Sequence, residues 1–161
     1  IDKLKIANFH LMREQTIGIV VFRPTPQGVR FLLLHKAGPY WIFPKGRPNL
    51  GEAGDELATA FREVEEESGI RRNQIRLVEG FRETYDYDFD VRTPGHGSRH
   101  VKDTAIFYLG ETDESVIRVS DEHLSGGWFD AATADRKLFY PGGRGVLAKA
   151  IAALRQRGIV V

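Results

Sequence analysis

A short amphipathic helix with a dense acidic face is the feature that most limits how this chain can fold. In residues 55–68, Leu57, Phe61 and Val64 recur at the i, i+4 and i+7 spacing of a helical stripe that packs on a core. Asp55 is well placed to be the N-cap, because its side chain can accept from the first free backbone N–H groups. The helix must therefore be covered on one side and open on the other.

The acidic face of this helix is formed by Glu63, Glu66 and Glu67, whose i, i+3 and i+4 spacing puts them side by side. Three like charges at this spacing repel one another, and a divalent cation bound by oxygen ligands relieves that repulsion. Mg²⁺ suits such a site, because it is bound by a few carboxylates together with the phosphates of a substrate. A run of acids is also typical of a solvent-exposed helix face, which is the more frequent meaning when the run stands alone.

The segment that precedes the helix favours the metal-binding interpretation. Residues 38–54 are rich in glycine and proline, and within them Lys45 and Arg47 place two bases next to the acidic helix. Gly46 between them allows a ligand to approach the backbone closely. Bases beside a metal are what a phosphate-bearing substrate needs, since both neutralise phosphate oxygens and the metal can lower the pKa of a bound water.

The rest of the chain alternates between short apolar runs and turns. The predicted strands are the apolar, β-branched or aromatic runs at residues 17–22, 30–35, 75–80, 83–90 and 104–109, with a shorter one around Trp128–Phe129. Residues 144–157 predict a C-terminal helix, and residues 91–103 predict a loop because they contain Pro94, Gly95 and Gly97. The elements intermix without a βαβ rhythm, so we expect one α+β domain over residues 1–161 with a mixed sheet.

Composition excludes several classes of protein. The 161 residues contain no cysteine, which removes disulfides and thiolate metal sites. No apolar run approaches the ~20 residues of a membrane helix, and residues 1–15 lack the apolar core of a signal peptide. The net charge of +1 gives no field for nucleic acid, although residues 51–70 hold seven acids and residues 136–157 hold six bases. We expect a cytoplasmic protein with no membrane association and no stable nucleic-acid complex.

Residues 46–70, GRPNLGEAGDELATAFREVEEESGI, resemble the Nudix box, G-x5-E-x7-R-E-U-x-E-E-x-G-U, in which U is aliphatic. The residues that match by type are Gly46, Glu52, Arg62, Glu63, Val64, Glu66, Glu67, Gly69 and Ile70. One departure is present: nine residues separate Glu52 from Arg62 where the family has seven. The extra pair falls most naturally at Ala53–Gly54, before the helix begins, so the helical half of the motif is intact.

Three further segments are similar to the asymmetric diadenosine tetraphosphate hydrolases of this family: Trp41–Gly46, Val78–Phe81, and Ser120–His123 followed by Trp128. This resemblance implies the Nudix fold, a mixed β-sheet sandwiched between α-helices. It also implies Mg²⁺-dependent hydrolysis, with Mn²⁺ as a substitute, of a small nucleoside polyphosphate. The first choice is cleavage of diadenosine tetraphosphate to ATP and AMP by a metal-activated water.

Two alternatives stay open at this point. Nudix relatives also act on RNA 5′ ends, on nucleoside triphosphates and on diphosphoinositol polyphosphates. A Nudix-fold module that binds a nucleotide without cleaving it belongs to another class of protein. Such modules usually lose carboxylates of the box, and the presence of Glu63, Glu66 and Glu67 argues against that class.

The resemblance also implies roles for individual residues. The metal ligands that it implies are the Gly46 carbonyl, Glu63, Glu66, Glu67 and Glu122, with Glu63 and Glu67 as the principal ones. Glu122 lies outside the box and matches a glutamate thought to help bind metal or activate water. Arg62 is implied to hold the carboxylates in place by hydrogen bonding, and Lys45 to contact phosphate.

Five further residues are candidates for binding the substrate. Tyr85 and Tyr87 could stack on adenine or bond phosphate, since aromatic faces bind bases, or they could pack in the core. Tyr140 could stack on a base or be an ordinary tyrosine. Lys102 sits where this family often has a lysine near phosphate, and His35 could line a cleft or simply end a strand.

Overall fold

The computed structural model describes residues 3–7 and 14–161. Residues 1–15, for which the sequence predicts no signal peptide, lie partly outside these described residues. The strands are β1 (Gln15–Thr25), β2 (Gly28–His35), β3 (Trp41–Ile42), β4 (Lys45–Gly46), β5 (Ile75–Leu77), β6 (Glu83–Thr93), β7 (Gly97–Thr112) and β8 (Ser125–Phe129). Within residues 14–161 the helices are α2 (Glu56–Ser68), α3 (Ala131–Lys137) and α4 (Pro141–Gln156), with 3-10 turns η1 (Leu50–Glu52) and η2 (Arg72–Gln74).

The strands form one mixed sheet. Its path runs β3-β2-β1-β7-β5, while β4 pairs with β1, β6 with β7 and β8 with β2. Strands β1 and β7 are parallel, with Ile17 opposite Ile106, and the other pairs are antiparallel. The expected mixed sheet is therefore confirmed.

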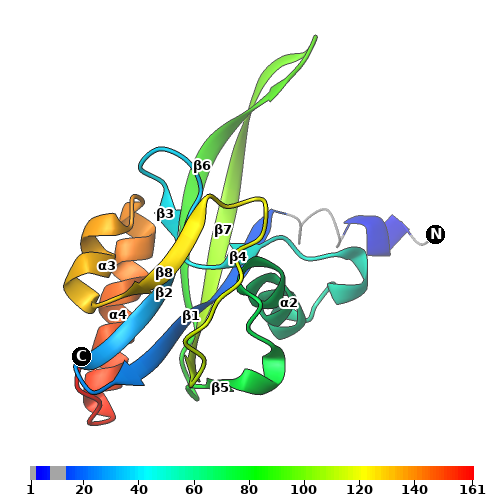
Figure 1. The fold of residues 1–161 in the computed structure, drawn as a ribbon. Helices are drawn as coiled ribbons and strands as arrows, with labels where there is room; N and C mark the ends of the chain where they lie inside the picture. Colours follow the sequence, from blue (N-terminus) through cyan, green and yellow to red (C-terminus); the bar gives the residue numbers. More distant parts are fainter. Residues whose placement is uncertain (1–2, 8–13) are drawn as a thin grey trace.

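Strand β1 is buried on both faces, because its apolar side chains alternate between two cores. Ile17, Ile19 and Val21 pack with the stripe on α2, and Val20 and Phe22 pack in the cluster that includes α4. Figure 1 shows α2 on one face of the sheet and α3 with α4 on the other. The expected α+β sandwich is confirmed: the mixed sheet is its central layer, and β1 is an inner strand of that sheet.

Helix α2 begins and ends as the sequence predicts. The Asp55 side chain accepts from the Ala58 backbone N–H at 3.0 Å, and Gly69 ends the helix with φ of 79°. Beside this helix, the chain at β4 runs so close to β1 that a Cβ at Gly18 would collide with the Pro44 carbonyl oxygen. Lys45 and Gly46 are thereby held against β1 next to α2.

Residues 91–103 are not a loop, and that prediction is wrong. Strands β6 and β7 pair without interruption from Glu83 opposite Phe107 to Thr93 opposite Gly97, and only residues 94–96 turn. Figure 1 shows this hairpin projecting beyond the body of the protein. Its outer side chains face water on both sides, so no apolar run marks it as a strand.

Smaller differences have similar causes. The predicted strand at 75–80 ends at Leu77, because Gly80 turns the chain with φ of 82°. Helix α3 and the two-residue strands β3 and β4 were not predicted, since each is too short to show a period. In the described part of the chain, no helix is long and apolar enough to span a membrane.

Candidate metal and phosphate site

Glu67 is the most deeply buried acid of the predicted site. It is 5% exposed, and its Oε2 accepts from the Lys45 backbone N–H at 3.2 Å. Burial, reinforced by the nearby charge of Glu63, raises the pKa of Glu67 to about 8. An ionised Glu67 is therefore disfavoured in the protein alone, and a bound cation would favour it.

Glu63 lies directly against the backbone of Gly46. A Cβ at Gly46 would overlap the Glu63 carboxylate, so only glycine leaves room for it. Burial raises the pKa of Glu63, and the hydrogen bond from Arg62 acts in the opposite direction. The Gly46 backbone, Glu63 and Glu67 thus share one small space where β4 meets α2.

Arg62 holds the acidic face together. Its Nε and Nη2 donate to the two Glu52 carboxylate oxygens at 2.7 and 2.9 Å, and Nη2 also donates to the Arg47 carbonyl at 2.8 Å. Its Nη1 donates to Glu63 at 2.8 Å and to Glu66 at 3.0 Å. Glu52 reaches Arg62 in spite of the two extra residues, because turn η1 and the bend at Ala53–Gly54 absorb them.

Glu66 and Glu122 complete a group that we call the carboxylate cluster, together with Glu63 and Glu67. Glu66 lies on the same helix face, with its side chain 58% exposed. Glu122 belongs to the segment before β8, and its charge is close enough to raise the pKa of both Glu63 and Glu67. The next residue, His123, is buried and pairs with the Ser120 hydroxyl at 3.3 Å, which anchors this segment.

The donor set of the carboxylate cluster fits a hard divalent cation. Its side-chain donors are carboxylate oxygens, and the Gly46 backbone lies against one of them. Within residues 3–7 and 14–161, no three acidic or histidine side chains converge in the arrangement of a ready-made metal site. Hydrogen bonds hold these carboxylates in the protein alone: Arg62 donates to Glu63 and Glu66, and the Lys45 backbone N–H donates to Glu67.

A cavity of about 320 Å³ opens beside the carboxylate cluster, and we call it the aromatic cavity. It is lined by Lys36, Ile42, Lys45, Tyr85, Tyr87, Asp88, Phe89 and Tyr140. Its volume is that of an ordinary small-molecule pocket, at the low end of about 300–1,000 Å³. The structure therefore brings together four predicted binding residues, namely Lys45, Tyr85, Tyr87 and Tyr140.

Lys45 joins the two parts of the site. Its backbone N–H holds Glu67, whereas its Nζ lies 5.3 Å from the Tyr87 ring centroid and donates to the Thr16 hydroxyl at 3.4 Å. Burial, together with the charge of Lys36, lowers the pKa of Lys45 to about 8. A phosphate near this ammonium would favour its charged form.

The three tyrosines of the cavity differ in burial. The Tyr85 ring stacks on Phe107 at 6.2 Å and leaves no space for a Cβ at Gly142, so it is wedged against α4. The Tyr87 hydroxyl donates a hydrogen bond to Asp103 Oδ2 at 3.1 Å. Tyr140 is 44% exposed at the mouth, where its ring stacks on that of Tyr40 at 6.0 Å. Tyr140 therefore has the ring most open to a ligand.

Lys102 and His35 lie outside the lining of the aromatic cavity. Lys102 pairs with Asp88 across the hairpin, and strand alternation puts its side chain on the other face from Tyr87. The His35 ring stacks on Trp41 at 4.6 Å, and its Nε2 pairs with the Gly38 carbonyl at 2.7 Å. His35 therefore fixes the turn between β2 and β3.

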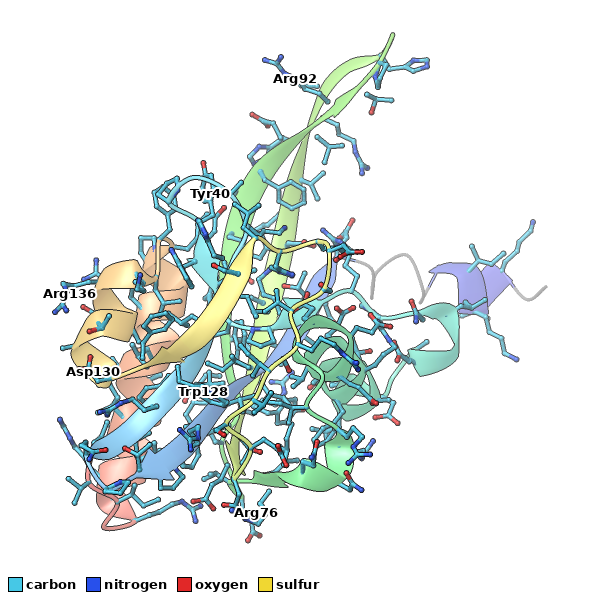
Figure 2. The ribbon with its side chains drawn as sticks, viewed as in Figure 1. Tyr40, Arg76, Arg92, Trp128, Asp130 and Arg136 are labelled. Carbon is cyan, nitrogen blue, oxygen red and sulfur yellow. The ribbon has the colours of Figure 1, made fainter. Side chains whose placement is uncertain are left out.

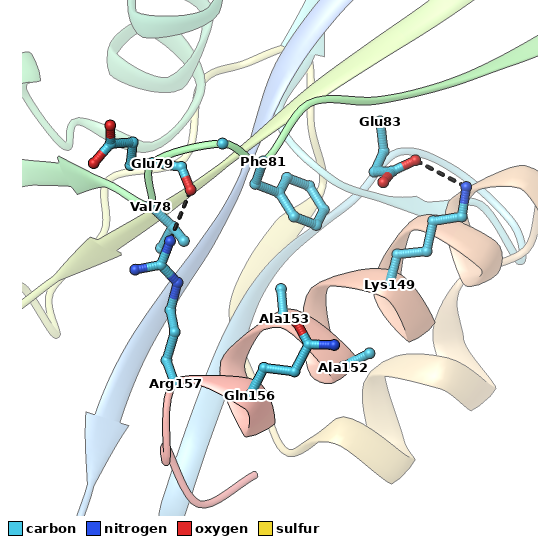
Figure 3. Close-up of a pocket in the computed structure, with 10 residues that line it drawn as sticks. Val78, Glu79, Phe81, Glu83, Lys149, Ala152, Ala153, Gln156 and Arg157 are labelled. Atoms are coloured by element: carbon cyan, nitrogen blue, oxygen red, sulfur yellow. Dashed lines mark hydrogen bonds and ion pairs between the residues drawn. The ribbon is translucent and has the colours of Figure 1, made fainter.

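A second hollow, of about 600 Å³, lies between residues 78–83 and α4 (Figure 3). Lys149 pairs with Glu83 at 2.8 Å there, and Arg157 donates to the Glu79 carbonyl at 2.7 Å. Both bases of this hollow already have partners. None of the predicted site residues lines it.

Sequence reasoning missed Asp103, the buried acid behind the aromatic cavity. It is 1% exposed and forms an ion pair with Arg47. A signal was present, because Val101, Asp103 and Ala105 share one face of a period-two pattern, which puts an acid among apolar residues. The wrong prediction of a loop at 91–103 hid that pattern.

Comparisons with known proteins bear on the family and the fold of this chain. A family model described as the NUDIX domain matches residues 12–150. The asymmetrical bis(5′-nucleosyl)-tetraphosphatase of Mus musculus is 34% identical over 127 residues, which cover 73% of this chain and 79% of that protein. The crystal structure of a C. elegans Ap4A hydrolase binary complex matches with a TM-score of 0.74 and 27% identity, covering 88% of this chain and 98% of that one.

A shorter similarity involves a viral protein. The mRNA-decapping protein g5R of African swine fever virus is 40% identical over 53 residues, which cover 33% of this chain and 20% of that protein. The family model, by contrast, spans every strand and α2.

Proposed function

The chain belongs to the Nudix family, and on that premise we propose that this hydrolase cleaves diadenosine tetraphosphate into ATP and AMP. The similarity to an asymmetrical tetraphosphatase and to an Ap4A hydrolase structure supports this substrate. We also propose that residues 1–161 act as one Nudix domain with its box at 46–70. The observation that carries the proposal is the position of Lys45, whose backbone holds Glu67 and whose side chain lines the aromatic cavity.

The proposed cofactor is Mg²⁺, with Mn²⁺ as a substitute. The groups that would hold it are the Gly46 carbonyl, Glu63, Glu66, Glu67 and Glu122. When bound, the cation would neutralise phosphate oxygens and lower the pKa of a water molecule. Arg62 keeps Glu63 and Glu66 oriented toward that position by donating to both.

The remaining steps belong to side chains of the protein. Lys45 and Lys36 hold phosphate oxygens between the aromatic cavity and α2. Glu122 accepts the proton of the attacking water, which attacks one phosphorus in line with the leaving nucleotide. No protein nucleophile is needed, because positioning and charge neutralisation lower the barrier.

Adenine binding is assigned to the aromatic cavity. Its volume suits one nucleoside, and the exposed Tyr140 ring offers a face for stacking. The Tyr87 hydroxyl is already bonded to Asp103, and Lys45 Nζ lies over the Tyr87 ring, 5.3 Å from its centroid. Neither Lys102 nor His35 lines the cavity, so any contact that they make with the substrate lies outside it.

A second candidate substrate is the 5′ end of an RNA. The similarity to a viral decapping protein favours it, although that match covers a third of the chain. In that case the aromatic cavity would take the terminal nucleotide, and the carboxylate cluster would serve the same chemistry.

A substrate panel tests the proposal. We expect kcat/KM for diadenosine tetraphosphate, measured with Mg²⁺, to exceed that for ATP, for a diphosphoinositol polyphosphate and for triphosphorylated or capped RNA. A higher kcat/KM for RNA would favour the second candidate. Tight Mg²⁺-dependent nucleotide binding without turnover of any substrate would identify a binding module instead.

A further inference from the structure

A buried ion pair between Arg47 and Asp103 lies behind the aromatic cavity. The Asp103 side chain is fully buried, and the Arg47 side chain is 36% exposed. Arg47 Nη1 donates to Asp103 Oδ1 at 3.1 Å, and Nη2 donates to Oδ2. Oδ2 also accepts the Tyr87 hydroxyl at 3.1 Å, so this carboxylate has three donors.

The hairpin does not depend on this pair for its own structure. Strands β6 and β7 are held by continuous pairing from Glu83 to Thr93. The pair also contributes little net stability, because the desolvation of Asp103 offsets its attraction to the partly exposed Arg47. Strand β4, in contrast, has only two residues and pairs with β1 only at Lys45 and Gly46. The pair therefore acts mainly on the position of the turn that follows β4.

Arg47 and Asp103 stand in the middle of a continuous path of polar contacts. At one end, the Arg47 carbonyl accepts from Arg62, which holds the carboxylate cluster. At the other end, Asp103 holds the hydroxyl of Tyr87, which lines the aromatic cavity. The Thr16 hydroxyl closes the path, since it lies 3.4 Å from both the Tyr87 hydroxyl and Lys45 Nζ.

We propose that Arg47 and Asp103 are a positioning pair, which fixes the separation between the aromatic cavity and the carboxylate cluster. This inference rests on the proposed function, because only a substrate with both a base and a polyphosphate needs the two parts in register. A ligand that engages two linked sites gains affinity only when their geometry permits both contacts at once. Neither Arg47 nor Asp103 needs to touch the substrate.

The test removes both charges in the variant R47M/D103L, which leaves no unpaired charge in the interior. Calorimetry measures three dissociation constants: for Mn²⁺ alone, for AMP alone, and for a methylene-bridged, non-hydrolysable diadenosine tetraphosphate with Mn²⁺. We expect affinity for the bridged analogue to fall about tenfold, while the affinities for Mn²⁺ and AMP change less than about twofold, since each part stays intact.

The matched control is R76M/D113L. Arg76 and Asp113 form an exposed ion pair at 3.1 Å, and Figure 2 shows Arg76 at the opposite end of the molecule from Arg92 on the hairpin. This control should leave all three constants unchanged. Where R47M/D103L does not fold, R47K keeps the charge but loses the two-point contact, and we expect about a threefold loss for the analogue alone.

The positioning role is overturned if R47M/D103L binds the analogue as tightly as the wild type does. If R47M/D103L does not fold, the same result for R47K overturns that role. A parallel loss of all three affinities overturns it as well, because it indicates a structural role. The positioning role is also overturned if the wild type binds the analogue no more tightly than it binds AMP, because the two parts of the site then do not act together. If the wild type binds the analogue tightly but cleaves no diadenosine tetraphosphate, the proposed function is wrong. The positioning role of Arg47 and Asp103 is then still decided by the three dissociation constants.

Discussion

The carboxylate cluster and the aromatic cavity meet at Lys45, yet they are held by different means. Three members of the cluster lie on one helix and are fixed by charged hydrogen bonds, above all from Arg62. The cavity is assembled from β4, β6 and the start of α4, and rings packed on one another fix it. The carboxylate cluster is therefore sensitive to changes of charge, and the aromatic cavity to changes of shape.

The largest effect is expected from Glu67→Gln in the carboxylate cluster. The amide keeps the size of the side chain but removes the charge that a divalent cation needs, so kcat should fall about 10³-fold or more. Steady-state kinetics at saturating Mg²⁺ measures this loss. The control is Glu65→Gln, because Glu65 lies two residues away on α2 and is exposed. Near-normal turnover of the Glu67 variant would remove Glu67 from the site.

Arg62→Lys should have the next largest effect. A lysine cannot reach Glu52, Glu63, Glu66 and the Arg47 carbonyl together, so the carboxylates lose their orientation. We expect metal affinity to weaken about 10–100-fold, as is typical when a partner that orients metal ligands is lost. Mn²⁺ titration measures it, and an unchanged affinity would mean that the cluster orients itself.

In the aromatic cavity, Tyr140→Ala should act on KM with little effect on kcat. Stacking on one base is worth about 1–3 kcal/mol, so KM should rise about 5–150-fold. Kinetics on diadenosine tetraphosphate tests this, with Phe139→Ala as the control, since Phe139 neighbours Tyr140 but does not line the cavity. A fall in kcat alone would place Tyr140 at the reacting atoms instead.

The smallest effect concerns stability without metal. The pKa of Glu67 rises from 4.5 to about 8 on folding, so its ionisation opposes folding increasingly as pH rises from 4.5 through 8. Glu67→Gln should therefore raise the Tm of the metal-free protein at pH 8 by several degrees, on the scale of about 2–4 °C per kcal/mol. At pH 4.5 the variant and wild type should melt together. An equal shift at both pH values would exclude ionisation as the cause.

Helix α2 could be predicted from the sequence because every contact that defines it is local. Its cap at Asp55, its stop at Gly69 and its apolar stripe lie within fifteen residues, and the Nudix box identified its acids. The role of Glu52 could not be predicted, because it depends on how turn η1 folds back to Arg62.

The aromatic cavity could be predicted only in part. Tyr85 and Tyr87 were candidates on a strand predicted at 83–90, and β6 with its period of two puts both on one face. Asp103, which binds the Tyr87 hydroxyl, and its partner Arg47 are 56 residues apart in sequence, so no local pattern joins them. Lys102 was a candidate by resemblance, and strand alternation turned it to the other face of the hairpin.

The products formed from diadenosine tetraphosphate with Mg²⁺ decide whether this protein is an asymmetric hydrolase of that substrate. Chromatographic separation should yield ATP and AMP in equal amounts from the wild type, and about a thousandfold less of both from Glu67→Gln in the same time. Two molecules of ADP would show symmetric cleavage and contradict the proposed substrate geometry. Absence of any product, with the protein folded and Mg²⁺ bound, would contradict the proposed function altogether.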